Sequence, residues 1–143
     1  MSSTPELKRV PNTSKRIVVI QGHPDPNSER FGRALANAYA EAARKASHEV
    51  RQVDVTSLTF PLLRSQTEWS GSPPADIAAA QADVAWAEHI VVFFPLWLGD
   101  MPALVKGFWE QVFRPGFAIA KAAGPASWRA GCGGGGGRLE DDR

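Results

Sequence analysis

Two short apolar runs constrain the fold of this chain more than any other feature of its sequence. Ile17 to Ile20 and Ile90 to Phe94 are unbroken stretches of β-branched and aromatic residues. Neither run alternates with polar residues, which is typical of strands covered on both faces of a parallel sheet. A less buried strand with three valines is predicted over Glu49 to Val55. Together these runs predict a parallel α/β sheet.

Segments with helical spacing follow each predicted strand, so the crossovers are expected to be right-handed. The first helix is expected from the spacing of Phe31, Leu35, Ala38, Tyr39 and Ala42, and the second from Ile77, Ala80, Val84 and Ala87. Pro102 is predicted to begin a third helix that ends near Phe113. Apolar residues cover more than one face of this third helix, so we expect it to be buried on two sides. Residues 56–74, which hold three prolines and a glycine, are predicted to form one long loop.

The chain of 143 residues is long enough for one domain with a core. The polar residues 1–15 are predicted to be a flexible leader, and residues 16–120 to be the folded domain. Residues 121–143 include five successive glycines and show no periodicity, so this low-complexity tail is predicted to be disordered.

Charge and cysteine content exclude several classes of partner. Lys and Arg total 16 against 15 Asp and Glu, a net charge of +1 that does not favour binding to nucleic acid. No apolar run approaches the roughly 18 residues that a membrane span needs, and the first residues do not resemble a secretion signal. Cys132 is the only cysteine, so a reducing compartment, the cytoplasm, is expected and Cys132 itself is taken as inert.

Several common site types are missing from the sequence. No Walker-type phosphate loop or G-x-G-x-x-G fingerprint follows the first predicted strand, and no G-x-S-x-G elbow occurs. No Cys/His spacing suits zinc, so no metal site is predicted. A receiver domain would need an aspartate at the end of the third strand, where this chain has Pro95-Leu96-Trp97.

Ligands of doubly wound sheets bind beyond the carboxyl ends of the strands, which for the order 2-1-3 lies between the first and third strands. The two loops leaving these strands are Gly22 to Arg30 and Pro95 to Pro102. The first offers backbone N–H groups, hydroxyls and the cation of Arg30, which suit a phosphate. The second places the flat ring of Trp97 at the mouth of a strand. This combination predicts a nucleotide or flavin site.

Simpler interpretations of the same residues stay open. Asn27 and Ser28 can serve only as helix caps, and Arg30 can be a solvated helix residue. His23 can be a structural histidine bonded to a neighbouring carbonyl. Trp97 can be a core residue or a dimer contact, while Trp69 and Trp86 are expected in packing or at the surface.

Two motifs resemble one enzyme family. Ile17 to Asp25 followed by Arg33-Ala34-Leu35 resembles the opening of flavodoxin-like NAD(P)H:quinone oxidoreductases. Phe94 to Phe108, which reads FPLWLGDMPALVKGF, is similar to a more specific segment of that family, PLxW followed by PAxLKGF. The resemblance covers residues 16–120. It implies a flavodoxin-like, three-layer, doubly wound sheet and a bound FAD or FMN, through which a hydride from NAD(P)H reduces a quinone by two electrons.

The resemblance also implies which residues hold the flavin. Four residues are expected at its phosphate and ribityl end, namely His23, Ser28, Arg30 and Phe31. Four more are expected along its ring system, namely Pro95, Leu96, Trp97 and Leu98. Family members are usually homodimers, which suits the apolar third helix. The chain departs from the family at Leu98, where many relatives have a second aromatic residue, and at Gln111, where many have arginine.

The family continues into C-terminal strands that this sequence lacks, so the predicted sheet is incomplete and its third strand becomes an exposed edge. The bias of residues 121–143 suggests a frameshifted, truncated flavoenzyme, so activity is in doubt and no catalytic acid or base is named. Three alternatives stay open: a non-catalytic binding subunit, such as an ancillary protein of a potassium-efflux system; a flavodoxin electron carrier, although such carriers are typically acidic; and a product without function.

Overall fold

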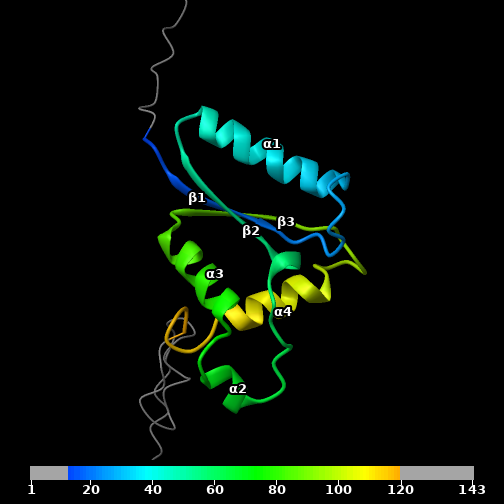
Figure 1. Ribbon diagram of the computed structural model, residues 1–143, viewed down its shortest axis with the longest axis vertical. Coiled ribbons are helices and arrows are strands. Elements are labelled where there is room, and N and C mark those ends of the chain that lie inside the picture. The colour runs from blue at the N-terminus through cyan, green and yellow to red at the C-terminus, as the bar shows by residue number, and fades with distance from the viewer. Residues whose placement is uncertain (1–12, 120–143) are drawn as a thin grey trace, which may run out of the picture.

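A computed structural model describes residues 13–119, which form a three-stranded parallel sheet with helices on both faces (Figure 1). The elements in chain order are β1 (Arg16–Gln21), α1 (Phe31–Lys45), β2 (Glu49–Asp54), the 3₁₀ turn η1 (Val55–Ser57), α2 (Gln66–Ser70), α3 (Ala75–Trp86), β3 (His89–Phe93) and α4 (Ala103–Val112). The strand order is β2-β1-β3, which confirms the predicted order and fold class. The predicted tail and residues 1–12 of the predicted leader lie outside the described residues.

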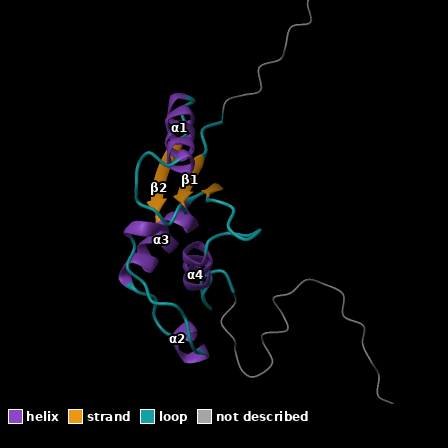
Figure 2. Ribbon diagram, turned by 90° about the vertical axis from the view of Figure 1, so that its right-hand side faces the viewer, coloured by secondary structure: helices purple, strands orange, loops and turns teal. Residues whose placement is uncertain are grey.

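The sheet, with β1 as its central strand, is the middle layer of three, between α1 on one face and α3 and α4 on the other (Figures 1 and 2). Val18 and Ile20 face a cluster with Ile77 of α3 and with Phe108 and Val112 of α4. On the opposite face, α1 packs three small residues against Ile17 and Val19, namely Ala36, Ala40 and Ala43. Alternate residues of one strand therefore supply two separate cores, which explains why the run from Ile17 to Ile20 contains no polar residue.

The buried stripe of α1 differs from the expected one. Phe31 and Leu35 were expected to face the core, but both are exposed, and Phe31 keeps 76% of its surface. The alanines displace these larger residues because a small side chain lets the helix approach the sheet closely. Phe31 and Leu35 instead face a cavity beside β3.

The predicted loop over residues 56–74 contains two short helical segments, η1 and α2, so the prediction of one unstructured connection is wrong. Ser65 accepts a hydrogen bond from the N–H of Glu68, and the Glu68 carboxylate accepts one from the N–H of Arg64. This reciprocal capping stabilises a helix of only five residues. The helix is too short to show an apolar period, so the pattern of the sequence could not indicate it.

A buried arginine fastens α2 to α4. Arg114 is 4% exposed, and its guanidinium donates to the carbonyl oxygens of Glu68 and Gly71 and to the side-chain oxygen of Gln111. Gln111 in turn donates to the carbonyl of Pro61 at 2.6 Å. The carbonyls at the end of α2 carry the partial negative charge that compensates this cation. Gln111, the departure from the family pattern, therefore has a structural partner in Arg114.

The helix α4 is buried over a broad surface and open on one side. Val105, Phe108 and Val112 pack in the core, whereas Trp109 and Phe113 lie on the other side. Their rings stack with centroids 5.0 Å apart and an angle of 12° between the planes, and 40% of Phe113 is exposed. Gly107 and Gln111 are buried on a further side, against Leu62 and Pro61. Burial on two sides, as expected, is therefore found in the described residues, while the side that holds Phe113 stays open. Pro102 precedes the first helical residue as the N-cap rather than beginning the helix.

The third strand is an edge, as predicted. Among the described residues β3 pairs only with β1, and Ile90 and Phe94 are exposed. The carbonyl of Phe93 accepts a hydrogen bond from Gly22 in the direction of β1. Because the direction of backbone groups alternates along a strand, the N–H and C=O groups of Ile90 and Val92 face away from β1. In the part of the chain that the structure describes, no helix is long and apolar enough to span a membrane.

Candidate functional site

The two loops singled out by the sequence lie together at the carboxyl ends of β1 and β3. Gly22 begins the first loop and donates a hydrogen bond to the carbonyl of Phe93 at 2.7 Å. A Cβ atom at Gly22 would lie 2.7 Å from a methyl of Val105, so only glycine fits at this crossing. A cavity of about 630 Å³ opens here, within the size range of small-molecule sites. It is lined by His23, Arg30, Phe31, Gly32, Leu35, Val92, Phe93, Phe94 and Pro95.

Two side chains that the sequence analysis did not propose for the site hold the first loop in place. Gln21 accepts a hydrogen bond from the N–H of His23 and donates to the carbonyl of Gly32. Arg33 donates to the carbonyl of Asp25 at 2.9 Å and to the carboxylate of Asp54 at 2.5 and 3.2 Å. Arg33 therefore ties the loop after β1 to the end of β2, and the loop is organised without a ligand.

The Asp54 carboxylate stays charged in this arrangement. Partial burial is the largest single influence on its pKa and raises it, but hydrogen bonds from Arg33 and Thr56 together outweigh burial. The pKa of Asp54 is therefore lower than its ordinary value. The sequence could have indicated Gln21, Arg33 and Asp54 as site residues only through their positions. Gln21 and Asp54 end strands, and Arg33 lies in the first helix.

His23 and Trp97, one from each loop, form an aromatic pair. Their ring centroids are 6.3 Å apart, and the ring planes meet at 83°, an edge-to-face arrangement. The Nδ1 atom of His23 accepts a hydrogen bond from the N–H of Asp25, so the neutral ring carries its proton on Nε2. His23 is thus a structural residue for its loop and also lines the cavity.

At the expected phosphate end of the site, Arg30 rather than Asn27 or Ser28 is the N-cap residue of α1. Arg30 forms an ion pair with Asp25, at 2.5 Å between Nη2 and Oδ2. Asn27 caps no helix but accepts a hydrogen bond from the N–H of Glu29 within the loop. Ser28 is exposed and precedes the N-cap by two residues. Arg30 and Phe31 line the cavity, whereas Ser28 does not.

The expected ring wall is a tight turn beyond β3. Trp97 and Asp100 exchange two backbone hydrogen bonds of 2.9 and 3.0 Å. Leu98 and Gly99 between them have φ angles of 49° and 82°, so Leu98 adopts a left-handed conformation that few residues of its kind tolerate. Pro95 lines the cavity, while Leu96 and Leu98 project from the turn and are strongly exposed.

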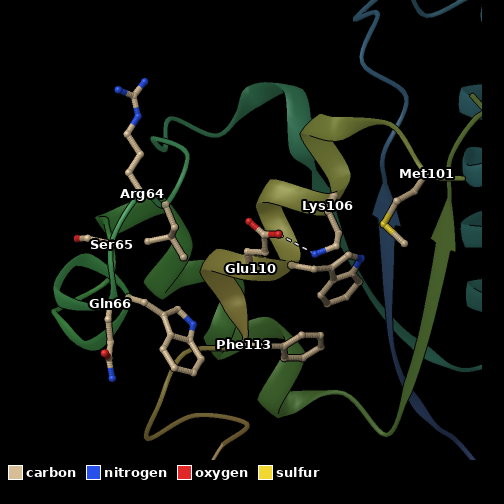
Figure 3. Close-up of a pocket in the computed structure, with 10 residues that line it drawn as sticks. Arg64, Ser65, Gln66, Met101, Lys106, Glu110 and Phe113 are labelled. Carbon is tan, nitrogen blue, oxygen red and sulfur yellow. Dashed lines mark hydrogen bonds and ion pairs between the residues drawn. The ribbon is translucent and has the colours of Figure 1, made fainter.

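A larger groove of about 880 Å³ lies between α2 and the outer face of α4 (Figure 3). Trp69 forms part of its wall, and Trp109 and Phe113 form another part. Lys106 and Glu110 pair across one turn of α4 at 2.6 Å along its rim. Trp69 was expected in packing or at the surface, and here it contributes to an open aromatic groove. No group of three metal-ligating side chains occurs within residues 13–119.

The fold and the position of the cavity define a class of protein. A family model described as "Flavodoxin-like fold" matches residues 15–143, so the chain belongs to this flavodoxin-like family. The match extends beyond residue 120, where the resemblance recognised in the sequence ended.

Named relatives narrow the comparison to NAD(P)H oxidoreductases. An uncharacterized NAD(P)H oxidoreductase of Haemophilus influenzae is 32% identical over 106 residues, 71% of this chain and 52% of that protein. NAD(P)H dehydrogenase [quinone] 1 of Rattus norvegicus is 27% identical over 129 residues, 76% of this chain and 46% of that protein. The chain thus spans about half the length of the curated relatives it matches.

A solved structure supports the fold independently. The NAD(P)H:quinone oxidoreductase of Methanothermobacter marburgensis superposes with a TM-score of 0.61 over 71% of this chain and 55% of that one. Its sequence identity of 24% means that this likeness bears on the fold alone.

Proposed function

We propose that this chain is the flavin-binding part of an NAD(P)H:quinone oxidoreductase of the flavodoxin-like class, acting in the cytoplasm. The observation that carries the proposal is the edge-to-face contact of His23 with Trp97, because it joins the two loops at a cavity of suitable size. The names of the relatives agree with this chemistry.

The residues present fit a flavin phosphate at one end of the cavity. His23 offers a ring N–H, and Arg30 offers a guanidinium at the mouth. Phe31 supplies apolar surface beside them, and the exposed Ser28 supplies a hydroxyl in the same loop, outside the cavity lining. These four residues would hold the phosphate and ribityl part of FAD or FMN.

The other wall suits the flat ring system. Pro95 lines the cavity, whereas Trp97 lies outside its lining, half exposed and against His23. Both would contact the ring, and Leu96 and Leu98 would exclude water around it. A bound flavin would supply the redox chemistry, namely two-electron transfer between NAD(P)H and a quinone. The chain's own contribution is to bind and orient the flavin, and no acid or base of this chain is assigned to the reaction.

The proposal includes a homodimer formed through α4. Half-buried Trp109 and exposed Phe113 present an aromatic face to the groove, and Trp69 extends this face on the other side of it. Lys106 and Glu110 lie side by side on α4, so two antiparallel copies of the helix would place opposite charges together.

A second candidate function is a non-catalytic binding subunit. The open edge of β3 favours it, because exposed Ile90 and Phe94 beside unpaired backbone groups suit pairing with another protein. This role requires no bound flavin, and the two functions are distinguished by whether the purified chain binds flavin.

Titration of FMN and of FAD into the purified chain, followed by flavin fluorescence, tests the leading proposal. Trp97→Leu should weaken flavin binding about tenfold because it removes one aromatic contact. Trp86→Leu is the matched control, since Trp86 contacts Arg51 away from the cavity, and it should leave binding unchanged. Circular dichroism checks that each variant is folded. Absence of binding by the folded wild-type chain would refute the flavin function and leave the binding subunit.

A further inference from the structure

Arg30 is the cation at the mouth of the cavity, and it already forms an ion pair with the carboxylate of Asp25 in the same loop. Asp25 Oδ2 lies 2.5 Å from Nη2 and 2.8 Å from Nε of Arg30. The two side chains are 35% and 52% exposed, respectively, so a ligand can reach the pair from solvent. Any phosphate that binds Arg30 must therefore share this cation with Asp25 or displace it.

The backbone of Asp25 is fixed on several sides. Its N–H donates to His23 Nδ1, and its carbonyl accepts from Arg33. One carboxylate oxygen, Oδ1, also accepts a hydrogen bond from the N–H of Asn27. The carboxylate cannot move far from Arg30 when a ligand arrives. It remains as a negative charge next to the place where a phosphate would bind.

The protonation state of Asp25 supports its role as a permanent anion. The N–H of Asn27 and, next in importance, the guanidinium of Arg30 hold the pKa of this carboxyl below its ordinary value. Asp25 is therefore charged at neutral pH.

We propose that Asp25 is an internal competitor for Arg30 and so limits how much a ligand's phosphate contributes to binding at this site. The inference rests on the proposed flavin function and adds to it a residue that sets specificity between phosphorylated and unphosphorylated forms of the ligand. An exposed ion pair is weak, so a phosphate can replace it. The carboxylate stays near Arg30 and repels the bound phosphate, so the loss of the ion pair and this repulsion both reduce what the phosphate adds to binding.

Asp25→Asn tests the competition directly. Asparagine retains an oxygen for the N–H of Asn27 but lacks the charge. Inorganic phosphate is titrated at low salt while the Nε–H resonance of Arg30 is followed by NMR. The variant should bind phosphate about three- to tenfold more tightly than the wild type, and the difference should shrink as salt rises. Equal phosphate affinity in the variant and the wild type would overturn the proposal.

Asp83→Asn is the matched control. Asp83 pairs with Arg51 at 2.9 Å, with similar side-chain exposures of 29% and 47%, but away from the cavity. The control changes net charge by the same amount and should leave phosphate affinity at the wild-type value. An equal gain in both variants would mean that overall charge, rather than competition for Arg30, controls binding, and it would also overturn the proposal.

A comparison of FMN with riboflavin separates this inference from the proposed function. The two molecules share the ring and differ by the phosphate, so the ratio of their affinities isolates its contribution. The ratio should rise about three- to tenfold in Asp25→Asn, with riboflavin affinity unchanged. If both flavins bind the wild type and the ratio does not change, the inference fails and the flavin function stands. If neither flavin binds, the flavin function fails, and the phosphate titration still decides the competition.

Discussion

Arg33 determines how the loop after β1 is presented to a ligand. Its side chain is 11% exposed, and its fork-shaped cation reaches the carboxylate of Asp54 and two backbone carbonyls of the loop. A lysine could not make these contacts together, because it has one compact charge instead of a planar set of donors. A single side chain thus couples the second strand to the candidate site.

This pair makes stability depend on pH in a defined direction. Since the folded state lowers the pKa of Asp54, the Arg33–Asp54 contact stabilises the fold above the pKa of the unfolded chain, and this stability is lost as pH falls through the lower, folded value. Urea unfolding midpoints measured from pH 7 to pH 3 should therefore fall less steeply in Asp54→Asn than in the wild type. Asp83→Asn, at an exposed pair, is the control. An unchanged slope in Asp54→Asn would contradict the assignment.

At the scale of elements, the turn at residues 97–100 holds Leu98 in an unfavourable backbone conformation and exposes its apolar side chain. Leu98 has a positive φ angle and is fully exposed, so it gains no burial in return for its conformation. Leu98→Asn should raise stability by about 1 kcal/mol, because asparagine tolerates left-handed backbone better. The same change should weaken flavin binding if Leu98 shields the ring.

Thermal unfolding and flavin titration of the Leu98 variant give the two measurements. Ser47→Gly is a useful comparison, since Ser47 also has a positive φ angle, of 68°, at the end of α1. It should stabilise the chain and leave flavin binding unaltered. A loss of stability in Leu98→Asn would mean that the leucine side chain packs against the fold.

The longer elements follow from their sequences, whereas the shorter ones depend on their surroundings. The helices α1 and α3 have enough turns for helical spacing to be visible in the sequence. The helix α3 ends at Trp86, one residue before the last expected position, Ala87. The buried face of α1 was harder to predict. Alanines and larger apolar residues lie on neighbouring faces of it, and distance to the sheet decided which face was buried.

At the scale of the molecule, the described chain leaves two apolar surfaces uncovered, the edge of β3 and the outer face of α4. Stable protein interfaces need on the order of 1,000 Å² or more of buried surface, which an isolated edge strand supplies less readily than a broad helical face. The aromatic groove between α2 and α4 is therefore the better candidate for the dimer.

Phe113→Glu tests this assignment. Phe113 is exposed beside Trp109, so a carboxylate there should prevent two copies from associating without disturbing the core. Sedimentation at micromolar concentration should give a dimer for the wild type and a monomer for the variant. Phe31→Glu, at the cavity beside α1, is the control and should stay dimeric. A monomeric wild type, or a dimer that survives Phe113→Glu, would refute the dimer through α4.

The candidate site was predictable where the fold rule applied and not beyond it. Because parallel strands end at the same edge, the sequence could place the loops that contain His23 and Trp97 together. It could not indicate that Asp25 forms an ion pair with Arg30, or Asp54 with Arg33, because such pairs depend on side-chain rotamers and on the paths of the loops. The assignment of all eight residues, His23, Ser28, Arg30, Phe31, Pro95, Leu96, Trp97 and Leu98, to a flavin stays a prediction.

The sequence by itself determined the strand order, the main helices and the edge position of β3, because these follow from local periodicity and from the general rules of parallel sheets. Only the tertiary structure decided which face of α1 is buried, where α2 forms and which partners Arg30, Arg33 and Arg114 have. Periodicity is a property of neighbours along the chain, whereas burial and ion pairing depend on groups that the sequence separates by up to dozens of residues.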